Sequence, residues 1–378
     1  MTTLGDRHLK IPKYLQLAEY LRHEISAGRF QPDDRLPSLN DLKEQFGANQ
    51  HTVERAHALL ENDGLIRREP GRGVFVNHPA PRKVTGSVGF LAPYNMQPEQ
   101  NIAYWGSVIA GMRSAARDHG YHLLIIDDGS AFDSWEKIDG AVLCDAHDPR
   151  DPHPGLPQYL QDFPYVALFN EIAEIACVTS DDFDGTYQLT KHLIQLGHQN
   201  IAYLANFNSG LSTFTQRKEG YLKALREAQI KPDPKWMREL LFRKEWEGLP
   251  SWYSQAGEYY TRRWLEEDWA ELECTAIIVQ NDDTALGVMD AFEAAGMQVP
   301  NDVSVVGYDG IVAQGAPSLT TMEVPLQEIG RQAMTSLLDW VKDPAQAPQN
   351  VCLPVRLIEG QTTAPPSGVI SQHALITA

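Results

Sequence analysis

The sequence predicts an α/β protein in which a winged helix-turn-helix is followed by a larger domain of doubly wound parallel sheets. Two observations predict this fold class. Residues 1–77 contain three short helix patterns and then a hairpin with a glycine-rich tip. From residue 85 onward, short apolar strands alternate with amphipathic helices, which is the pattern of parallel sheets covered by helices on both faces.

The first two helices are marked by the residues at their ends. Pro12 suits the first turn of a helix, where a missing N–H costs nothing, and Gly28 ends the run. Apolar side chains recur between them at helical spacing. Ser38 and Asp41 form a capping-box pattern, so a second helix is predicted over residues 39–46.

A third helix and a hairpin complete the module. Gly47 makes a turn, and Asn49 caps a helix that is predicted to run to about residue 61. Its buried side carries Val53, Ala56 or His57, and Leu60. Residues four apart on a helix lie one above the other, so the outward face carries Gln50, His51, Glu54 and Arg55. Residues 65–68 then pair with residues 74–76 across glycines that permit positive φ.

A module of this shape is too small for catalysis and fits the major groove of DNA, so it predicts double-stranded operator DNA as a partner. The wing tip places Arg72 at the level of the phosphates or the minor groove. The residues expected to contact DNA are Arg35, Ser38, Asn40, Asn49, Gln50, His51, Thr52, Glu54, Arg55 and Arg72.

Several of these side chains have a purely structural interpretation as well. Glu54 could simply pair with His51 or Arg55 on a solvated helix face. His57 is interpreted as a packed or surface histidine without a functional role. The arginines at positions 67, 68 and 72 could be ordinary hairpin charges, although a wing is where phosphate contacts are expected.

Residues 10–77 resemble the DNA-binding domain of the GntR family, from Tyr14 through LPS at 36–38 and TV at 52–53 to GVFV at 73–76. The sequence departs from the family pattern on the reading surface. Leu39-Asn40 replaces the usual Glu-Arg, Asn49-Gln50 replaces Ser-Arg, and Glu54 replaces an arginine. Arginine is the commonest bidentate partner of guanine, whereas Asn or Gln prefers adenine and Glu accepts from cytosine. We therefore expect an operator that differs from the usual one.

Composition limits the class of protein. The chain has 378 residues, of which 43% are hydrophobic, as expected for two or three core-forming domains. It contains no apolar run of 18 residues and no signal-peptide pattern, so we expect a cytoplasmic protein with no membrane partner. The cysteines lie far apart without metal-ligand spacing and are predicted to be reduced, buried thiols; they are Cys144, Cys177, Cys274 and Cys352. No metal and no cofactor are predicted.

The charge is unevenly divided along the chain. Residues 1–80 contain 11 Lys and Arg against 11 Asp and Glu, whereas the remainder contains 21 against 39 and so carries the whole net charge of −18. The long-range field of such a chain repels DNA. Binding outside the operator should therefore be weak and strongly salt-dependent.

A proline-containing link at residues 78–84 separates the reading module, residues 1–77, from residues 85–378. Strands are predicted at residues 87–92, 123–126, 141–143, 166–169, 201–204, 276–279 and 304–306. Helices are predicted at residues 104–120, 184–197, 217–228 and 284–296. No glycine-rich dinucleotide or phosphate-binding loop follows any of these strands, so nucleotide phosphate chemistry is not predicted.

This larger part resembles the effector-binding domain of the LacI/GalR repressors, which has the fold of periplasmic sugar-binding proteins. The motifs that carry the resemblance are HLIQLGHQNIA at 192–202, RKEGY at 217–221, NDDTALG at 281–287, DVSVVGYD at 302–309 and PSLTT at 317–321. The resemblance implies two lobes joined by three crossing strands, near residues 170, 280 and 323. Lobe 1 is expected at about 85–169 and 324–344, and lobe 2 at about 170–322 and 345–362.

By the same resemblance the effector lies between the lobes, where Arg217, Asn281 and Asp309 form a polar clamp joined by Asn170 and Thr213. A sugar needs donors and acceptors for each hydroxyl and an aromatic wall for its ring. Tyr104 or Trp105 on one lobe and Trp252 on the other are the candidates for that wall. The alternatives are a surface ion pair for Arg217 and core packing for either tryptophan.

The whole chain thus has the arrangement of arabinose-repressor-like regulators, a GntR-type reader on a LacI-type sensor. It predicts a homodimeric repressor of carbohydrate-utilisation genes that a monosaccharide or related small sugar releases from its operator. A purine or nucleoside effector and a co-repressor ligand remain alternatives. An enzyme is not predicted, and no residue is expected to be catalytic, because the sequence shows no nucleophile elbow, paired carboxylates or metal cluster. A transport-type binding protein does not account for residues 1–80.

Two features depart from the LacI pattern. Only eleven residues separate Asp127 from Asp139, where the family has a full crossover helix, and this puts the usual face of lobe 1 and its dimer contact in question. The helix that LacI repressors insert into the minor groove is also missing from this sequence.

Overall fold

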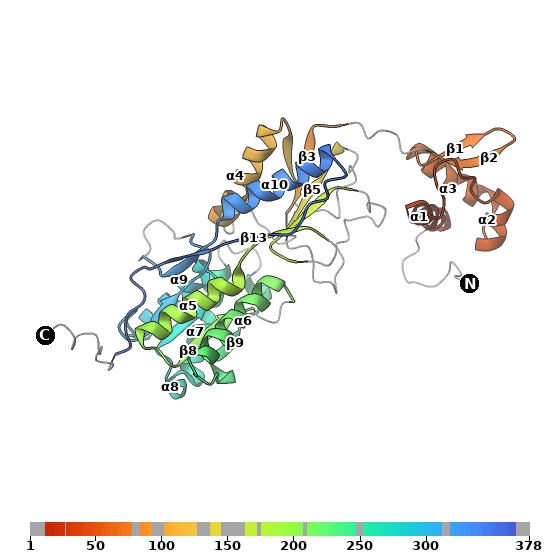
Figure 1. Ribbon diagram of the computed structural model, residues 1–378. Coiled ribbons are helices and arrows are strands. Elements are labelled where there is room, and N and C mark those ends of the chain that lie inside the picture. Colours follow the sequence, from red (N-terminus) through yellow and green to blue (C-terminus); the bar gives the residue numbers. More distant parts are fainter. Residues whose placement is uncertain are drawn as a thin grey trace. The chain divides into compact units, whose positions relative to one another are not determined.

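A computed structural model describes residues 12–26, 28–77, 84–92, 102–126, 137–144, 163–171, 175–206, 210–246, 252–311 and 318–367. The chain divides into two compact units (Figure 1). One comprises Met1–Thr85 with Leu156–Phe163, and the other comprises Gly86–Gly155 with Pro164–Ala378. Apart from Val84, the expected link lies outside the described residues. Among the described residues, no helix is long and apolar enough to span a membrane.

The first unit is a winged helix-turn-helix, as predicted. Its elements are α1 (Lys13–Ser26), α2 (Leu39–Phe46), α3 (Gln50–Asn62), β1 (Ile66–Glu69) and β2 (Gly73–Val76). The two strands are antiparallel. The three helices close over one apolar core, formed chiefly by Leu17, Leu21, Leu42, Val53, Leu60 and Ile66.

Local capping explains where the two short helices begin. Ser38 Oγ accepts a hydrogen bond from the Asp41 backbone N–H at 3.3 Å, and the Asp41 carboxylate accepts from the Ser38 N–H at 2.9 Å. This is the predicted capping box. Gly47 follows α2 with φ 56°, a left-handed conformation that favours glycine. Asn49 then caps α3, so both predicted helix starts are confirmed.

The second unit contains two parallel sheets. The larger has six strands in the order β13-β7-β6-β5-β3-β4, and its neighbouring strands are parallel. We call this sheet, with the two helices that cover it, lobe 1. Its strands are β3 (Ser87–Leu91), β4 (His122–Ile126), β5 (Ala141–Cys144), β6 (Tyr165–Leu168), β7 (Cys177–Ser180) and β13 (Val351–Leu353).

Lobe 2 is built on the second parallel sheet, whose order is β11-β10-β8-β9. Its strands are β8 (Ile201–Ala205), β9 (Met237–Glu239), β10 (Ala276–Val279) and β11 (Ser304–Val306). Its helices are α5 (Asp182–Leu196), α6 (Ser212–Glu227), α7 (Trp252–Glu267), α8 (Trp269–Leu272) and α9 (Asp282–Ala294), with short 3-10 turns η2 (Pro234–Trp236) and η3 (Lys244–Trp246).

The lobe 1 helices, α4 (Ile102–Asp118) and α10 (Leu326–Lys342), lie side by side (Figure 1). They cross closely because each has a glycine at the contact. A Cβ on Gly111 would collide with the backbone oxygen of Gln327, and a Cβ on Gly330 would collide with that of Val108. This crossing brings Val108 and Gly111 of α4 against the start of α10, more than 200 residues away in sequence.

The chain passes between the lobes at places that differ in part from those expected. Strands β7 and β13 both belong to the lobe 1 sheet, so the first crossing follows Ser180 and the predicted crossing near residue 170 is wrong; another crossing follows Leu353. The expected crossing near residue 280 is wrong, because β10 is fully buried between β8 and β11 in lobe 2. The crossing near residue 323 is confirmed: β12 (Thr321–Glu323) pairs with β14 (Arg356–Ile358), and α10 follows in lobe 1.

All four helices predicted in the larger unit begin earlier than expected, α4 at Ile102 rather than residue 104 and α5 at Asp182 rather than residue 184. Helix α6 starts at Ser212 rather than at residue 217, and α9 starts at Asp282 rather than at residue 284. Helix α7 was not predicted at all. Its buried side includes Gly257 and Thr261, so its sequence gives no clear apolar stripe.

Candidate DNA interface and effector site

The first turns of α3 carry the predicted reading face. Gln50, His51 and Arg55 are exposed and Glu54 is half-buried. Gln50 Nε2 donates to Glu54 Oε1 at 2.7 Å, and the Arg55 guanidinium lies over the Tyr14 ring at 3.8 Å. Glu54 is therefore held by Gln50. The structural interpretation, in which Glu54 pairs with His51 or Arg55, named the wrong partner. The amide and the carboxylate form one fixed polar unit on the helix surface.

Two other predicted DNA contacts also cap helices. Ser38 accepts the α2 cap bond, and Asn49 Oδ1 accepts from both the backbone N–H and the hydroxyl of Thr52, each at 2.8 Å. Their remaining donors, the Ser38 O–H and the Asn49 side-chain NH₂, are the groups that could reach phosphate. Asn40 is exposed on α2, two residues after Ser38.

Most arginines of the wing are paired within the unit. Arg67 binds Asp33 at 2.7 Å, Arg68 binds Glu61 at 3.0 Å, and Arg72 binds Glu69 at 2.5 Å. These pairs offset the charges of the wing arginines within the unit itself. Arg72 is nonetheless 73% exposed, so its pair is the most open to exchange for a phosphate.

Arg35 differs from the wing arginines. It is exposed, and among the described residues it forms no ion pair. Its guanidinium lies against Gly73, where an added Cβ would be 2.6 Å from Nε. The backbone at Gly73 has φ 127°, which also favours glycine. Because residue 73 is a glycine, strand β2 can approach the Arg35 guanidinium closely.

His57 is a core residue of the reading unit. It is 3% exposed and its Nε2 has no hydrogen-bond partner. Burial lowers the pKa of His57, and the nearby Arg68 lowers it further. The packed interpretation is therefore confirmed, and the ring is neutral at physiological pH.

In lobe 2, Arg217 lies at the centre of a buried polar cluster. Its Nε donates to Asp182 Oδ1 and its Nη1 donates to the Gln280 backbone oxygen, both at 2.7 Å. Its Nη2 lies 3.8 Å from Asp309 Oδ1, and the guanidinium is stacked 3.6 Å from the Tyr308 ring centroid. Only 6% of Arg217 is exposed, so the surface ion pair considered as an alternative is wrong.

Asp182 and Asp309 share the charge of this one guanidinium, and a third buried aspartate, Asp282, lies near Asp309. Burial raises the pKa of Asp182, which Arg217 partly offsets. Burial likewise raises the pKa of Asp309 well above its usual range. Burial also raises the pKa of Asp282 to about 7, although donors from Thr321 and Ile311 oppose this. The cluster therefore contains more acceptor than donor capacity.

Asp282 holds the loop that carries Asp309. Its carboxylate accepts from the Thr321 hydroxyl at 2.5 Å and from the Ile311 backbone N–H at 2.7 Å. Asp309 itself has φ 106°, which is strained for a residue with a side chain. Its backbone is fixed by bonds to Met322 O at 2.9 Å and from Val324 N at 3.2 Å. The crossing strand and the start of α9 together keep Asp309 in place.

The other predicted polar residues also make structural contacts. Asn281 caps α9, accepting from the Thr284 N–H at 2.9 Å and hydroxyl at 2.6 Å. Asn170 Oδ1 accepts from the Ser212 N–H at 3.0 Å, and the Thr213 hydroxyl donates to Phe169 O at 2.7 Å. Asn170 and Thr213 are therefore brought together at the start of α6.

The predicted aromatic residues fall into two groups. Tyr104 and Trp105 lie at the start of α4, 5.0 Å apart, and both contact Phe169, at 5.6 and 6.1 Å. Trp252 is half-buried at the start of α7. Its ring stacks on those of Tyr253 and Trp246, with centroids 3.9 and 6.5 Å away. The Phe242 ring meets it edge-on, with a centroid distance of 5.3 Å.

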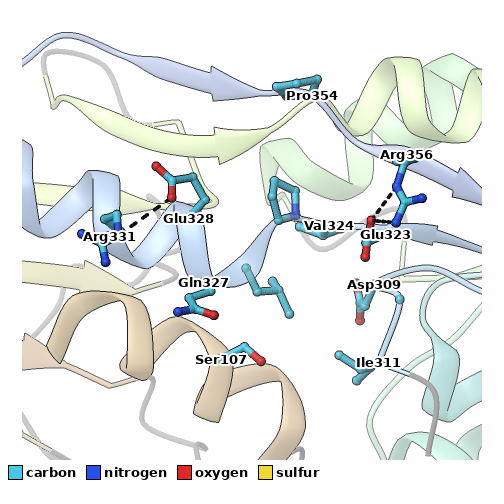
Figure 2. A pocket seen from close by; sticks show the side chains of 13 residues that line it. Ser107, Asp309, Ile311, Glu323, Val324, Gln327, Glu328, Arg331, Pro354 and Arg356 are labelled. Atoms are coloured by element: carbon cyan, nitrogen blue, oxygen red, sulfur yellow. Dashed lines mark hydrogen bonds and ion pairs between the residues drawn. The ribbon is translucent and has the colours of Figure 1, made fainter. Parts of the chain in front are cut away.

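A pocket of about 530 Å³ opens where the lobes are connected (Figure 2). We call it the hinge pocket. Lobe 1 contributes Ser107 of α4 and the start of α10, lobe 2 contributes the loop after β11, and the crossing segments provide the rest. Its lining residues are Ser107, Asp309, Gly310, Ile311, Glu323, Val324, Pro325, Leu326, Gln327, Glu328, Arg331, Pro354 and Arg356.

Of the eight predicted effector residues, Asp309 lines the hinge pocket. Sequence reasoning missed Ser107 and Gln327, because neither belongs to a motif and they meet only through the α4–α10 crossing. It also missed Asp182, the partner of Arg217. Asp182 lies two residues after a buried strand, at the start of a helix, which is the signal that was available.

Comparison with known proteins agrees with both units. Residues 13–76 match the family model described as bacterial regulatory proteins, gntR family. Residues 190–363 match the model of a periplasmic binding protein-like domain. The chain joins a GntR-type DNA-binding domain to a periplasmic-binding-protein-like domain. This combination makes it a DNA-binding transcriptional regulator.

Relatives with similarity over most of the chain include two named repressors. The chain is 26% identical over 351 residues to the arabinose metabolism transcriptional repressor of Geobacillus stearothermophilus, covering 88% of this chain and 92% of the relative. It is 26% identical over 310 residues to the HTH-type transcriptional repressor PurR of Edwardsiella ictaluri, covering 78% and 82%.

Solved structures of LacI-type regulators have a similar fold. A LacI family transcriptional regulator from Enterococcus faecium with bound ribose has a TM-score of 0.60 and 25% identity, covering 74% of this chain and 99% of that one. The complex of the transcriptional regulator CelR with cellobiose has a TM-score of 0.64 and 20% identity, covering 86% and 100%. The second likeness concerns the fold alone.

Proposed function

We propose that this regulator represses transcription by binding a two-fold operator as a homodimer, and that a small sugar between the lobes releases it. The observation that carries the proposal is the Asp309 carboxylate. It lies 5% exposed on the wall of the hinge pocket, beside a buried Arg217 and within reach of both lobes. Sugar hydroxyls need such fixed acceptors and donors.

The effector acts through the difference in its affinity for two arrangements of the lobes. A ligand that contacts Asp309 on one side and Ser107 and the start of α10 on the other favours a closed pocket. We propose that closure changes the spacing of the two reading modules, with a coupling of about 1–3 kcal/mol. Ribose bound to a LacI family regulator, and the relative named as an arabinose metabolism repressor, support a sugar as the ligand.

The test is operator affinity with and without saturating sugar. Operator fragments selected with the wild-type protein are titrated in the presence of L-arabinose, D-ribose, D-glucose or cellobiose. We expect one sugar to weaken operator binding at least about 5-fold, as the coupling requires. Asp309→Ala should bind the same operator with unchanged affinity but respond to no sugar. Arg263→Ala, an exposed α7 residue paired with Glu267, is the matched control.

A tighter complex with sugar would make the ligand a co-repressor, and no change with any sugar would contradict the sugar effector. Sedimentation at micromolar concentration tests the homodimer separately. A monomer both with and without operator DNA would contradict it, because one winged module alone buries too little surface for specific affinity.

A further inference from the structure

The reading face of α3 contains a carboxylate that no cation balances among the described residues. Glu54 Oε1 accepts a hydrogen bond from Gln50 Nε2 at 2.7 Å, and a neutral amide does not offset its charge. Arg55, the next residue, lies over the Tyr14 ring, 3.8 Å from its centroid. Arg68 of the wing donates at 3.2 Å to the Glu54 backbone oxygen rather than to its carboxylate. Glu54 therefore brings an unbalanced negative charge to the surface that approaches DNA.

Such a charge is costly inside the major groove. Phosphates line the groove, and a helix that enters it displaces water from its own side chains and from the base edges. A carboxylate regains the lost hydration only from donors. The donors at the base edges of the major groove are the amino groups of adenine N6 and cytosine N4. Glu54 therefore penalises every site that does not present an amino group to it.

Gln50 is oriented by this carboxylate. Because a carboxylate only accepts, the Gln50 NH₂ group must face Glu54, and its second N–H and its Oε1 remain for a base. Adenine matches them with N7 as acceptor and N6 as donor, whereas guanine presents two acceptors, N7 and O6. In water this exposed hydrogen bond contributes little. In the groove, where water is displaced, no solvent competes with it.

The spacing of the two residues matches neighbouring base pairs. Side chains four apart on a helix have Cβ atoms about 6 Å apart, and base pairs follow one another every 3.4 Å or so. Gln50 and Glu54 lie one helical turn apart on the face that begins α3. Each can therefore meet a different pair of the same base step.

We propose that Gln50 and Glu54 read the amino groups of adjacent base pairs, Gln50 that of an adenine and Glu54 that of a cytosine, and that the Glu54 charge excludes sites without them. This rests on the operator binding of the proposed function and adds which base edges the operator must present. Specificity then comes from rejection as well as from attraction. Removal of the charge should strengthen binding to wrong sites.

The first experiment deletes single amino groups from the DNA. Operators are selected from a random library with the full wild-type chain, and affinities are measured by fluorescence anisotropy at one salt concentration. We expect an adenine and a cytosine in adjacent base pairs of each half-site. Replacing that adenine by purine, or that cytosine by pyrimidin-2-one, removes the amino group and should weaken wild-type binding about 10- to 100-fold.

Two variants assign each amino group to its reader. Glu54→Ala lacks the acceptor for cytosine, so the pyrimidin-2-one substitution should change its affinity by less than about twofold. Gln50→Ala should be equally insensitive to the purine substitution. A purely structural role for either residue would weaken binding without changing these sensitivities, and that result would overturn the assignment.

A third variant tests the rejection. Glu54→Gln removes the charge and keeps the shape of the side chain. It should bind the operator with the cytosine–guanine pair inverted, which turns guanine acceptors toward residue 54, at least about tenfold more tightly than wild type does. Glu44→Gln removes an exposed charge from α2 and is the matched control, so it should change binding to both operators by the same factor. An equal gain on both operators with Glu54→Gln would overturn the rejection.

Unchanged wild-type affinity after both amino-group deletions would overturn the readout as a whole. A selected operator without an adenine and a cytosine in adjacent pairs would do the same, and the regulator would keep its proposed function and lose only this inference. If no operator could be selected, the proposed operator binding would itself be wrong, and the inference would fail with it.

Discussion

Two arginine–aspartate pairs of equal length lie in the two units and play opposite parts. In the reading unit Arg67 and Asp33 are 2.7 Å apart, with side chains 36% and 56% exposed. In lobe 2 Arg217 and Asp182 are also 2.7 Å apart, but their side chains are 8% and 1% exposed. The bond length is the same, and the surroundings decide what each pair does.

Exposed pairs are weak and exchangeable, because water and salt compete with them. The wing arginines can therefore leave their acids for DNA phosphates at little cost. A buried pair cannot be opened without leaving an uncompensated charge in the interior. The difference separates a surface that exchanges partners from a cluster that holds a site rigid.

The largest effect is expected from breaking the buried pair. Arg217→Met should destabilise the periplasmic-binding-protein-like unit by about 3–5 kcal/mol, because Asp182 is left buried and unpaired. The double variant Arg217→Met, Asp182→Asn should recover much of this loss, since both charges are gone. Urea unfolding of the wild type, the Arg217→Met and Asp182→Asn single variants and the double variant measures it. A double variant as unstable as the sum of the singles would show that the two residues do not act as a pair.

The pH dependence of stability should come from the same cluster. Asp282 has a pKa of about 7 in the folded protein, raised by burial above its ordinary value. A raised pKa means that the folded state holds the proton more tightly than the unfolded chain does. Its contribution is therefore full below about pH 4 and is lost as the pH rises through 7.

We accordingly expect this unit to lose roughly 2–4 kcal/mol of stability between pH 5 and pH 8. Asp282→Asn should flatten the profile, while the control Asp339→Asn, an exposed residue of α10, should leave it unchanged. Thermal unfolding across this range gives the answer. A wild-type profile that rises with pH would contradict the sign.

A change of base preference is expected from the reading helix. Glu54 is tied to Gln50 at 2.7 Å, so both present one polar unit to the groove. Glu54→Arg should break that unit and shift the preferred base toward guanine. Arg72→Ala, at the exposed wing tip, should instead weaken binding to all sites alike and also lower its salt dependence, because one phosphate contact is lost. Selection from a random operator library measures the consensus, and an identical consensus for wild type and Glu54→Arg would contradict the assignment.

The reading unit could be predicted almost completely from sequence because its signals are local. Ser38 and Asn49 cap the helices that follow them, and glycines mark the turns. In the larger unit the strands were predictable where they are apolar, as in β10. Strand β7 contains Thr179 and Ser180, and its partner β13 is only three residues long and 170 residues away. No local sequence pattern predicts such a pairing. The chain crossings expected near residues 170 and 280 were therefore misplaced.

The effector site shows the same limit. Arg217 and Asp309 could be singled out because each belongs to a recognisable motif. That Arg217 is already bound to Asp182 depends on packing between two helices, and α5 and α6 meet only in the folded protein. Ser107 and Gln327 are ordinary polar residues in sequence. They become candidates only because Gly111 and Gly330 let their helices approach.

The smallest effect is expected from the exposed pair itself. Arg67 binds both Asp33 and Glu69 and also donates to the Val76 carbonyl, so three partners share one guanidinium. A double-mutant cycle on urea unfolding, with Arg67→Ala and Asp33→Ala, should give a coupling free energy below about 1 kcal/mol. Adding 0.5 M salt should lower this coupling further. Glu69 takes over when Asp33 is removed, which lowers the coupling further. A coupling as large as that of Arg217 with Asp182 would mean that burial is not what distinguishes the two units.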